Sequence, residues 1–230
     1  MARKFSFATV RLIVATAGVL LLAIGVAQAE FIVSVSDNPP AAATSSQVLD
    51  AKVGPGTIGQ LYLYGRGDTR LSGLSLDVLA AGNAIRFTSA QVHNPGGRWS
   101  FLDGPLVVMD NQVTNIGGAA IPPSTPGVGG PIAEEIPGVG FLLATLGYQA
   151  NGPLGSLSQI SLRVGSNLIA DYEGVGAPVR LGGPNAPLVN GENAGASGVT
   201  GSIGVVPEPA TCALAGLAMV GLAGLVRRRK

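Results

Sequence analysis

Few side chains in this chain have the chemistry that catalysis or metal binding requires. His93 is the only histidine and Cys212 the only cysteine, so a Cys/His zinc site and a disulfide framework are excluded. His93 could serve as a general base beside a serine and an aspartate. It lies, however, in the turn-like run His93-Asn94-Pro95-Gly96-Gly97, and no nucleophile motif accompanies it. We therefore expect a structural histidine and no enzyme.

Acidic and amide side chains offer a weaker signal. Asp103, Asp110 and Asn111 could supply oxygen ligands to Ca²⁺, although their spacing fits no EF-hand and both residue types favour turns. Glu134 and Glu135 are adjacent, would point in different directions and are expected to be solvated loop charges. Calcium binding stays open, and no cofactor is expected.

Two short motifs resemble functional signatures by composition. The run Gly54-Pro55-Gly56-Thr57-Ile58-Gly59 satisfies G-x-G-x-x-G, but a dinucleotide site needs a preceding strand and a following helix, whereas a strand follows here. Arg66-Gly67-Asp68 is the tripeptide that many integrins recognise, and three residues match easily by chance. We interpret both as turns, the second as a hairpin turn between Tyr64 and Leu71.

Aromatic residues could form a sugar-binding platform, since ring faces bury the apolar face of a sugar. Tyr62 and Tyr64 are separated by one residue and share a face of a predicted strand. Trp99 follows a glycine-rich turn. The same parity is equally consistent with core positions, so a flat exposed face containing all three would be needed to favour glycan binding.

Composition and charge restrict the remaining classes. The 230 residues include 35 glycines and 16 prolines, while only 12% are charged; so much Gly and Pro opposes helical bundles and coiled coils. The net charge is +1, and no internal basic patch exists, which excludes a nucleic-acid binder. Seven of the fourteen basic residues lie in the two terminal segments, so the body between Glu30 and Val206 is mildly acidic.

The N-terminal segment, residues 1–29, has the organisation of a secretory signal peptide. Arg3 and Lys4 precede an uncharged apolar run, Leu12–Val26, which is expected to be helical. Ala27 and Ala29 then supply the small residues that signal peptidase accepts. Cleavage by signal peptidase after translocation through the export machinery would make Glu30 the new N-terminus. The alternative is a retained N-terminal anchor, for which the run is short.

The C-terminal segment, residues 205–230, has three elements in order. Pro207, Glu208 and Pro209 come first, then the uncharged residues Ala210 to Val226, and finally the basic cluster Arg227, Arg228, Arg229 and Lys230. The 17 uncharged residues would form a helix of about 25 Å, near the lower limit for crossing a membrane. The basic cluster would stay cytoplasmic. Cys212 lies in this run and is expected to be a small apolar residue, although acylation is conceivable.

This constellation resembles the PEP-CTERM sorting signal of bacteria. The resemblance implies that a membrane-embedded, exosortase-type protease recognises Pro207, Glu208 and Pro209, and that the protein is delivered to the envelope or the extracellular matrix. These residues would then be substrate positions for the protease and not catalytic residues of this chain. The alternative is an ordinary tail anchor.

The body, residues 30–204, shows the alternation of half-buried β-strands. Leu74, Leu76 and Val78 alternate with polar residues, as do Ile160, Leu162 and Val164. Gln60–Tyr64 and Phe141–Tyr148 are apolar on both faces, which predicts central or covered strands. Further strands are expected at these positions: 31–36, 71–78, 84–87, 106–109, 158–164, 168–172 and 199–203. Eight to ten short strands predict an all-β, antiparallel sandwich.

Two Gly/Pro-rich stretches, 117–140 and 174–198, are expected to be long loops, the second wrapping the sandwich before its last strand. The strand order resembles cohesins and related jelly-roll-like carbohydrate-binding modules, on Gly59–Tyr64, Leu71–Val78 and Phe141–Leu146. That resemblance implies a fold, without a dockerin-binding role. We expect an exported structural or adhesive module; the alternative is a module that binds carbohydrate such as exopolysaccharide.

Overall fold

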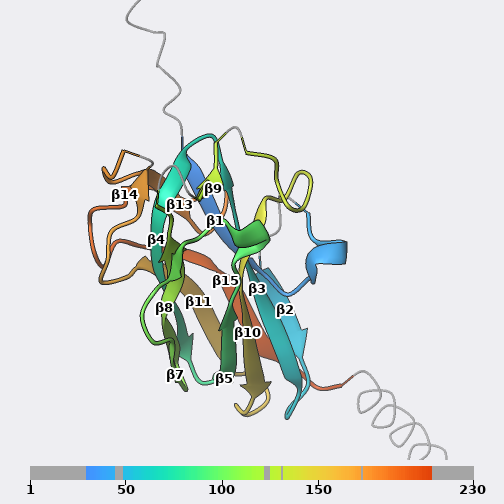
Figure 1. Cartoon of the computed structure of the whole chain (residues 1–230). Helices are drawn as coiled ribbons and strands as arrows, with labels where there is room; N and C mark the ends of the chain where they lie inside the picture. The colour runs from blue at the N-terminus through green and yellow to red at the C-terminus, as the bar shows by residue number, and fades with distance from the viewer. Residues whose placement is uncertain (1–29, 45–48, 122–124, 131, 172, 209–230) are drawn as a thin grey trace, which may run out of the picture.

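A computed structural model describes residues 30–44, 49–121, 125–130, 132–171 and 173–208, and these form two β-sheets packed face to face (Figure 1). The first sheet has six strands in the order β14-β13-β1-β3-β10-β5. Their bounds are β1 Phe31–Ser36, β3 Ile58–Gly67, β5 Ile85–Val92, β10 Phe141–Ala150, β13 Pro178–Leu181 and β14 Leu188–Asn190.

The second sheet has nine strands, six of them in the order β2-β15-β11-β4-β8-β6. These are β2 Leu49–Val53, β15 Ser197–Val205, β11 Leu157–Val164, β4 Arg70–Gly82, β8 Gln112–Ala119 and β6 Phe101–Leu102. The short strands β9 (Val128–Gly129) and β12 (Ala170–Asp171) pair with β4, and β7 (Val107–Met109) pairs with β8. Two 3-10 turns, η1 (Pro40–Ala42) and η2 (Pro95–Gly97), lie in connections.

The core forms where the alternating apolar residues of both sheets meet. Leu61 and Leu63 of β3 and Leu146 of β10 are fully buried, as are Leu162 of β11 and Ile203 of β15. Removing such side chains from water is the main favourable contribution to folding, about 1.5–3 kcal/mol for each one. The predicted all-β sandwich is therefore confirmed for the described residues, and β3 and β10 are internal strands of their sheet, as their doubly apolar pattern predicted.

The structure corrects the sequence prediction in two respects. Strands β2, β6, β8, β13 and β14 were not predicted, and the last two lie inside the stretch 174–198 that was expected to be a loop. The sandwich is also not purely antiparallel, because β1 pairs in parallel with β13 and β2 in parallel with β15. Proline at the start of β13 and the glycines of β8 hide the alternation in these segments.

The ends of the described chain lie at opposite ends of the sandwich. The carbonyl of Glu30 accepts a hydrogen bond from the amide of Asp68, just after β3 ends. Val205, the last residue of β15, accepts one from the amide of Gly155, and Gly155 belongs to the β10–β11 turn that lies beside the start of β3. The ten residues of β3 separate these two ends by about 30 Å.

Neither predicted membrane segment can be compared with this fold. The signal peptide and the residues after Glu208 lie outside the described part of the chain. Within the described part, no helix has the length and apolarity needed to cross a membrane.

Candidate functional site at the C-terminal exit of the sandwich

The chain leaves the sandwich at the end of β15, directly before the predicted sorting residues. Val205 pairs with Val53 of β2, and the amide of Val206 donates a hydrogen bond to the carbonyl of Val53 at 2.9 Å. On the other side, the amide of Val205 donates to the carbonyl of Ser156 at 3.0 Å. The fold is thus hydrogen-bonded up to Val206, and no linker separates it from Pro207.

Pro207 and Glu208 are exposed at this exit. The side chain of Glu208 lies against Gly54, where a Cβ atom would come within 2.9 Å of Glu208 Cγ. Together with Pro55 and Leu154, Pro207 and Glu208 line a hollow of about 300 Å³. The sorting residues therefore rest on the β2–β3 and β10–β11 turns. Pro209 and the basic residues Arg227, Arg228, Arg229 and Lys230 lie outside the described residues.

The predicted signal-peptide cleavage point lies at the opposite end. Glu30 immediately precedes β1, and its carboxylate lies 2.7 Å from Nε of Arg180. Arg180 also donates to the carbonyl of Ala186 at 2.6 Å. The first residue of the expected mature chain is therefore part of the fold, whereas Ala27 and Ala29 lie outside the described residues.

The three predicted aromatic residues do not form a flat exposed face. Trp99 and Tyr64 are 3% and 2% exposed, and Tyr62 is half-buried. The rings of Tyr62 and Tyr64 do share one face of β3 and stack with centroids 6.4 Å apart. Trp99 is held by a pair of hydrogen bonds with the Asn94 side chain and packs in the core.

Burial raises the pKa of Tyr64, one of the two stacked tyrosines. The hydroxyl of Tyr64 donates to the carbonyl of Asn38 at 3.0 Å. Desolvation, with a smaller contribution from Tyr62, raises the pKa of Tyr64 to about 12. Desolvation also raises the pKa of Tyr148, with Asp37 adding to the effect.

The other candidates from the sequence are dispersed. His93 Nε2 lies 2.9 Å from Thr145 Oγ1, and its amide extends the pairing of β5 with β10. Asp103 lies beside Gly117, whereas Asp110 precedes the other end of β8, so the proposed calcium ligands are not brought together. No cluster of three metal-ligating side chains occurs among the described residues.

The two short motifs and the paired glutamates have structural roles. Gly54–Thr57 turns from β2 into β3, as predicted. Arg66 and Gly67 end β3 and pair with β1, and Asp68 lies in the turn before β4. The turn is not the predicted hairpin, because β3 and β4 belong to different sheets. The carboxylates of Glu134 and Glu135 accept hydrogen bonds from the amides of Gly138 and Leu142, respectively.

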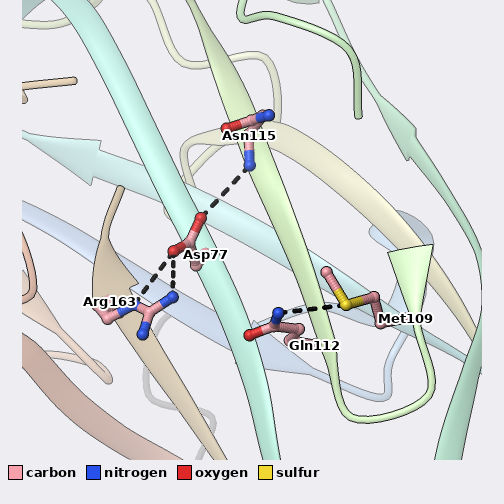
Figure 2. A network of polar contacts seen from close by, with 5 residues as sticks. All are labelled: Asp77, Met109, Gln112, Asn115 and Arg163. Atoms are coloured by element: carbon pink, nitrogen blue, oxygen red, sulfur yellow. Dashed lines mark hydrogen bonds and ion pairs between the residues drawn. The ribbon is translucent and has the colours of Figure 1, made fainter. Parts of the chain in front are cut away.

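A polar network that sequence reasoning missed crosses the second sheet (Figure 2). Asp77 of β4 accepts hydrogen bonds from the Nε and NH2 groups of Arg163 at 3.1 and 2.6 Å. Its other oxygen faces the amide of Asn115 at 3.4 Å. Asn115 has a positive φ of 64° at a bulge in β8. The alternation of β4 placed Asp77 outward, but no local signal identified Arg163, 86 residues away, as its partner.

A groove of about 580 Å³ lies on the same sheet beside β6. Phe101 and Leu102 are 62% and 48% exposed at its rim, and Leu168 is 43% exposed. Small residues such as Gly73 and Ala170 form part of its wall, and Asn167 supplies an amide. Phe101 has the most exposed aromatic ring of the described residues, and it was not among the predicted sugar-contacting residues.

Comparison with known proteins supports the prediction for the C-terminus. Residues 205–230 match the family model described as the PEP-CTERM protein-sorting motif, so the predicted sorting signal is confirmed. The match begins at Val205, the last residue of β15. A comparison with curated proteins finds no match.

Solved structures of cohesins are similar to this chain. A non-cellulosomal cohesin from Archaeoglobus fulgidus is 12% identical with a TM-score of 0.41, covering 80% of this chain and 94% of that one. CaCohA2 from Clostridium acetobutylicum is 13% identical with a TM-score of 0.41, covering 80% and 96%. A type III cohesin of the ScaE scaffoldin of Ruminococcus flavefaciens is 11% identical with a TM-score of 0.44, covering 76% and 87%. The expected similarity to cohesins is thus found.

Proposed function

We propose that this chain is an exported protein of the bacterial envelope or extracellular matrix. Its C-terminal segment holds it in the membrane until an exosortase-type protease acts near Pro207–Pro209. The β-sandwich serves as a non-catalytic structural or adhesive module. The signal peptide starts translocation and signal peptidase then removes residues 1–29. The C-terminal span halts translocation, which leaves the basic tail on the cytoplasmic side and the sandwich outside.

The observation that carries this proposal is the continuity of the sorting motif with the fold. The motif starts at Val205, and Pro207 and Glu208 are exposed immediately after the last hydrogen-bonded residue. A protease in the membrane would therefore meet these residues at the surface of a folded sandwich. Proline at both sides of Glu208 restricts the backbone to extended conformations and presents the carboxylate.

The separation of the two chain ends supports cleavage of the signal peptide. Glu30 and Val205 lie at opposite ends of β3, about 30 Å apart. Few residues separate each end from its apolar run in the sequence. A sandwich standing on its C-terminal end could not keep both runs in one bilayer, so release of the N-terminal run is favoured.

The dispersion of reactive side chains among the described residues supports the proposal of a non-catalytic role. His93 contacts a threonine hydroxyl and Glu134 and Glu135 are occupied by backbone amides. Asp77 is buried and engaged with Arg163. An acid/base pair converging on a cleft would be needed for hydrolysis.

Carbohydrate binding is the second candidate, and the groove beside Phe101 favours it. An exposed ring next to glycine and alanine leaves room for a sugar to stack. The Asn167 Nδ2 group donates to Asp103 Oδ1 at 2.9 Å, and its amide oxygen can accept from a sugar hydroxyl. Tyr62 alone of the three residues named from the sequence keeps partial exposure.

Mass spectrometry of both termini of the native protein tests the first proposal. Protein from the membrane and culture fractions should begin at Glu30 and end near Pro207–Ala210 in the processed form. An intact Lys230 in every fraction would identify a simple tail anchor and would refute processing by an exosortase-type enzyme.

A further inference from the structure

Exposed apolar side chains gather at the end of the sandwich from which the C-terminal segment leaves. Ile58 at the start of β3 is 78% exposed, and Leu154 and Leu157 at the β10–β11 turn are each 57% exposed. We call these three residues the apolar end. Backbone hydrogen bonds join its turns: the amide of Gly56 donates to Ala150, and that of Gly155 to Val205. Strands β3 and β5 begin at this end and β10 finishes there, at the bottom of the view in Figure 1.

Exposed leucine and isoleucine side chains need an explanation when they converge at one end. Ile58 is the first residue of β3 in the first sheet, and Leu157 is the first residue of β11 in the second sheet, so they flank the end of the sandwich from both layers. Charged side chains of both signs lie nearby. Lys52 pairs with Gly204, the register partner of Leu157, Arg86 bonds Gln149, the register partner of Ile58, and Glu208 lines the hollow with Leu154. Apolar contact, rather than net charge, therefore distinguishes this surface.

The length of chain beyond the fold identifies what this surface meets. Val206 is hydrogen-bonded to β2, and the uncharged run begins at Ala210. The four residues from Val206 to Pro209 span at most about 14 Å. Leu154 lines the same hollow as Pro207 and Glu208. Glu208 is only two residues from Ala210, where the uncharged run begins. The polar headgroup layer on one side of a bilayer occupies about 5–8 Å, so the exit of the sandwich stays within roughly 6–9 Å of this layer while the tail is inserted.

We propose that Ile58, Leu154 and Leu157 form a lipid-contacting surface that seats the sandwich on the membrane before processing. The inference rests on the proposed function, because it needs residues 210–226 to cross the bilayer. Seating would fix Glu208 at the depth of the headgroups, where a membrane-embedded protease can reach it. Leucine and isoleucine gain free energy on leaving water for the membrane interface.

Site-specific fluorescence quenching in the full chain tests this surface. Ile58→Cys, Leu154→Cys and Leu157→Cys would be made singly in a Cys212→Ser background and labelled with an environment-sensitive dye. Val175→Cys is the matched control, because Val175 is 54% exposed but lies near β12, away from the exit. Each protein would be reconstituted into vesicles of phosphatidylethanolamine and phosphatidylglycerol that carry a headgroup spin label.

The three labels should show blue-shifted, strongly quenched emission, and the Val175 label should show neither. Absence of quenching in protein that floats with the vesicles would overturn the inference while leaving membrane tethering intact. Failure to float would refute the tethering itself and, with it, the seating. Quenching that arises only when the protease is co-reconstituted would identify a protein-docking surface and overturn the lipid assignment.

A spacer distinguishes affinity from enforced proximity. Ten Gly/Ser residues inserted between Val206 and Pro207 would let the sandwich move roughly 17 Å from the membrane. Quenching that persists with the spacer supports a surface with its own affinity for lipid. Complete loss of quenching would mean that the short tether alone held the residues there, and would overturn the proposal.

Discussion

The amide of Val206 donates a hydrogen bond to the carbonyl of Val53, and this bond joins the first residue after the last strand to the edge strand of its sheet. The two residues that follow, Pro207 and Glu208, are exposed. Sandwich and sorting signal thus form one continuous unit. The position of Glu208 relative to the sandwich is determined by the fold, because no flexible linker intervenes.

Replacing Glu208 with Gln should block tail processing without affecting the fold. The side chain is exposed, so the free energy of unfolding should change by less than about 0.5 kcal/mol. Loss of a charge-assisted hydrogen bond of about 1.5–3 kcal/mol should slow processing at least tenfold. Intact-mass measurement of the membrane fraction would detect the accumulating unprocessed chain. The control is Glu173→Gln, an exposed carboxylate elsewhere; equal processing of the two variants would contradict the proposal.

The Asp77–Arg163 pair should contribute to stability in a coupled way. The side chain of Asp77 is only 9% exposed and that of Arg163 35%. Removal of Arg163 therefore leaves a poorly solvated carboxylate, and removal of Asp77 leaves a guanidinium without its charge partner. We expect Asp77→Ala and Arg163→Ala each to lower the free energy of unfolding by about 2 kcal/mol. The double variant should lose about 1 kcal/mol less than the sum.

Urea denaturation of the two single variants and the double variant provides this cycle. Arg86→Ala is the control, since Arg86 is exposed and its side chain bonds only that of Gln149 within the described part of the chain. A change there should stay within about 0.5 kcal/mol. Strict additivity of the Asp77 and Arg163 variants would show that the pair observed in Figure 2 has no energetic coupling.

High pH should destabilise the sandwich through Tyr64. Its pKa is raised from 10.0 to about 12 in the folded protein, so between these values the unfolded chain loses a proton that the folded chain retains. Stability is therefore fully present below pH 10 and falls as the pH rises toward 12, with a slope of at most about 1.4 kcal/mol per pH unit for this group.

Urea unfolding between pH 9 and 12 would measure this slope in the wild type and in Tyr64→Phe. The variant should show a shallower dependence, because Tyr148, whose pKa is also raised, continues to contribute. It should also lose about 1 kcal/mol at neutral pH, since the bond from the Tyr64 hydroxyl to Asn38 is removed. An unchanged slope would assign the high-pH loss to other groups.

Glycan binding, if present, should depend on Phe101 and not on Trp99 or Tyr64. Phe101→Ala removes an exposed ring at the groove and should weaken retention on polysaccharide roughly tenfold, given about 1–1.5 kcal/mol for one aromatic contact. Affinity electrophoresis in exopolysaccharide gels would measure it. Tyr62→Ala is the matched aromatic control; equal retardation of wild type and both variants would argue against this groove.

The alternation of residue types determined much of the fold in advance. Phe31–Ser36 was predicted with the bounds that β1 has, and the predictions for β10 and β11 were close to their observed bounds, because period-two patterns survive wherever one face is buried. Strand β8 escaped prediction, since Asn115 at positive φ and two consecutive glycines interrupt its pattern. Glycine and proline do not indicate by their residue type whether a strand position is buried or exposed.

The alternation of side chains along a strand also predicted that Tyr62 and Tyr64 share a face, but it did not predict whether that face is exposed to solvent. Asn38, 26 residues earlier, binds the Tyr64 hydroxyl. Exposure depends on such distant segments, which explains why Phe101 and not Trp99 presents its ring to solvent.

The sequence by itself determined the sorting signal of this protein, because such a signal is a linear run of residues that is recognised in its order along the chain. The family match at 205–230 depends on no fold. Only the tertiary structure decided where that run begins relative to the sandwich, which turns support Glu208, and which apolar residues gather beside it. Ile58, Leu154 and Leu157 are separated by up to 99 positions, and only the packing of two sheets brings them to one end.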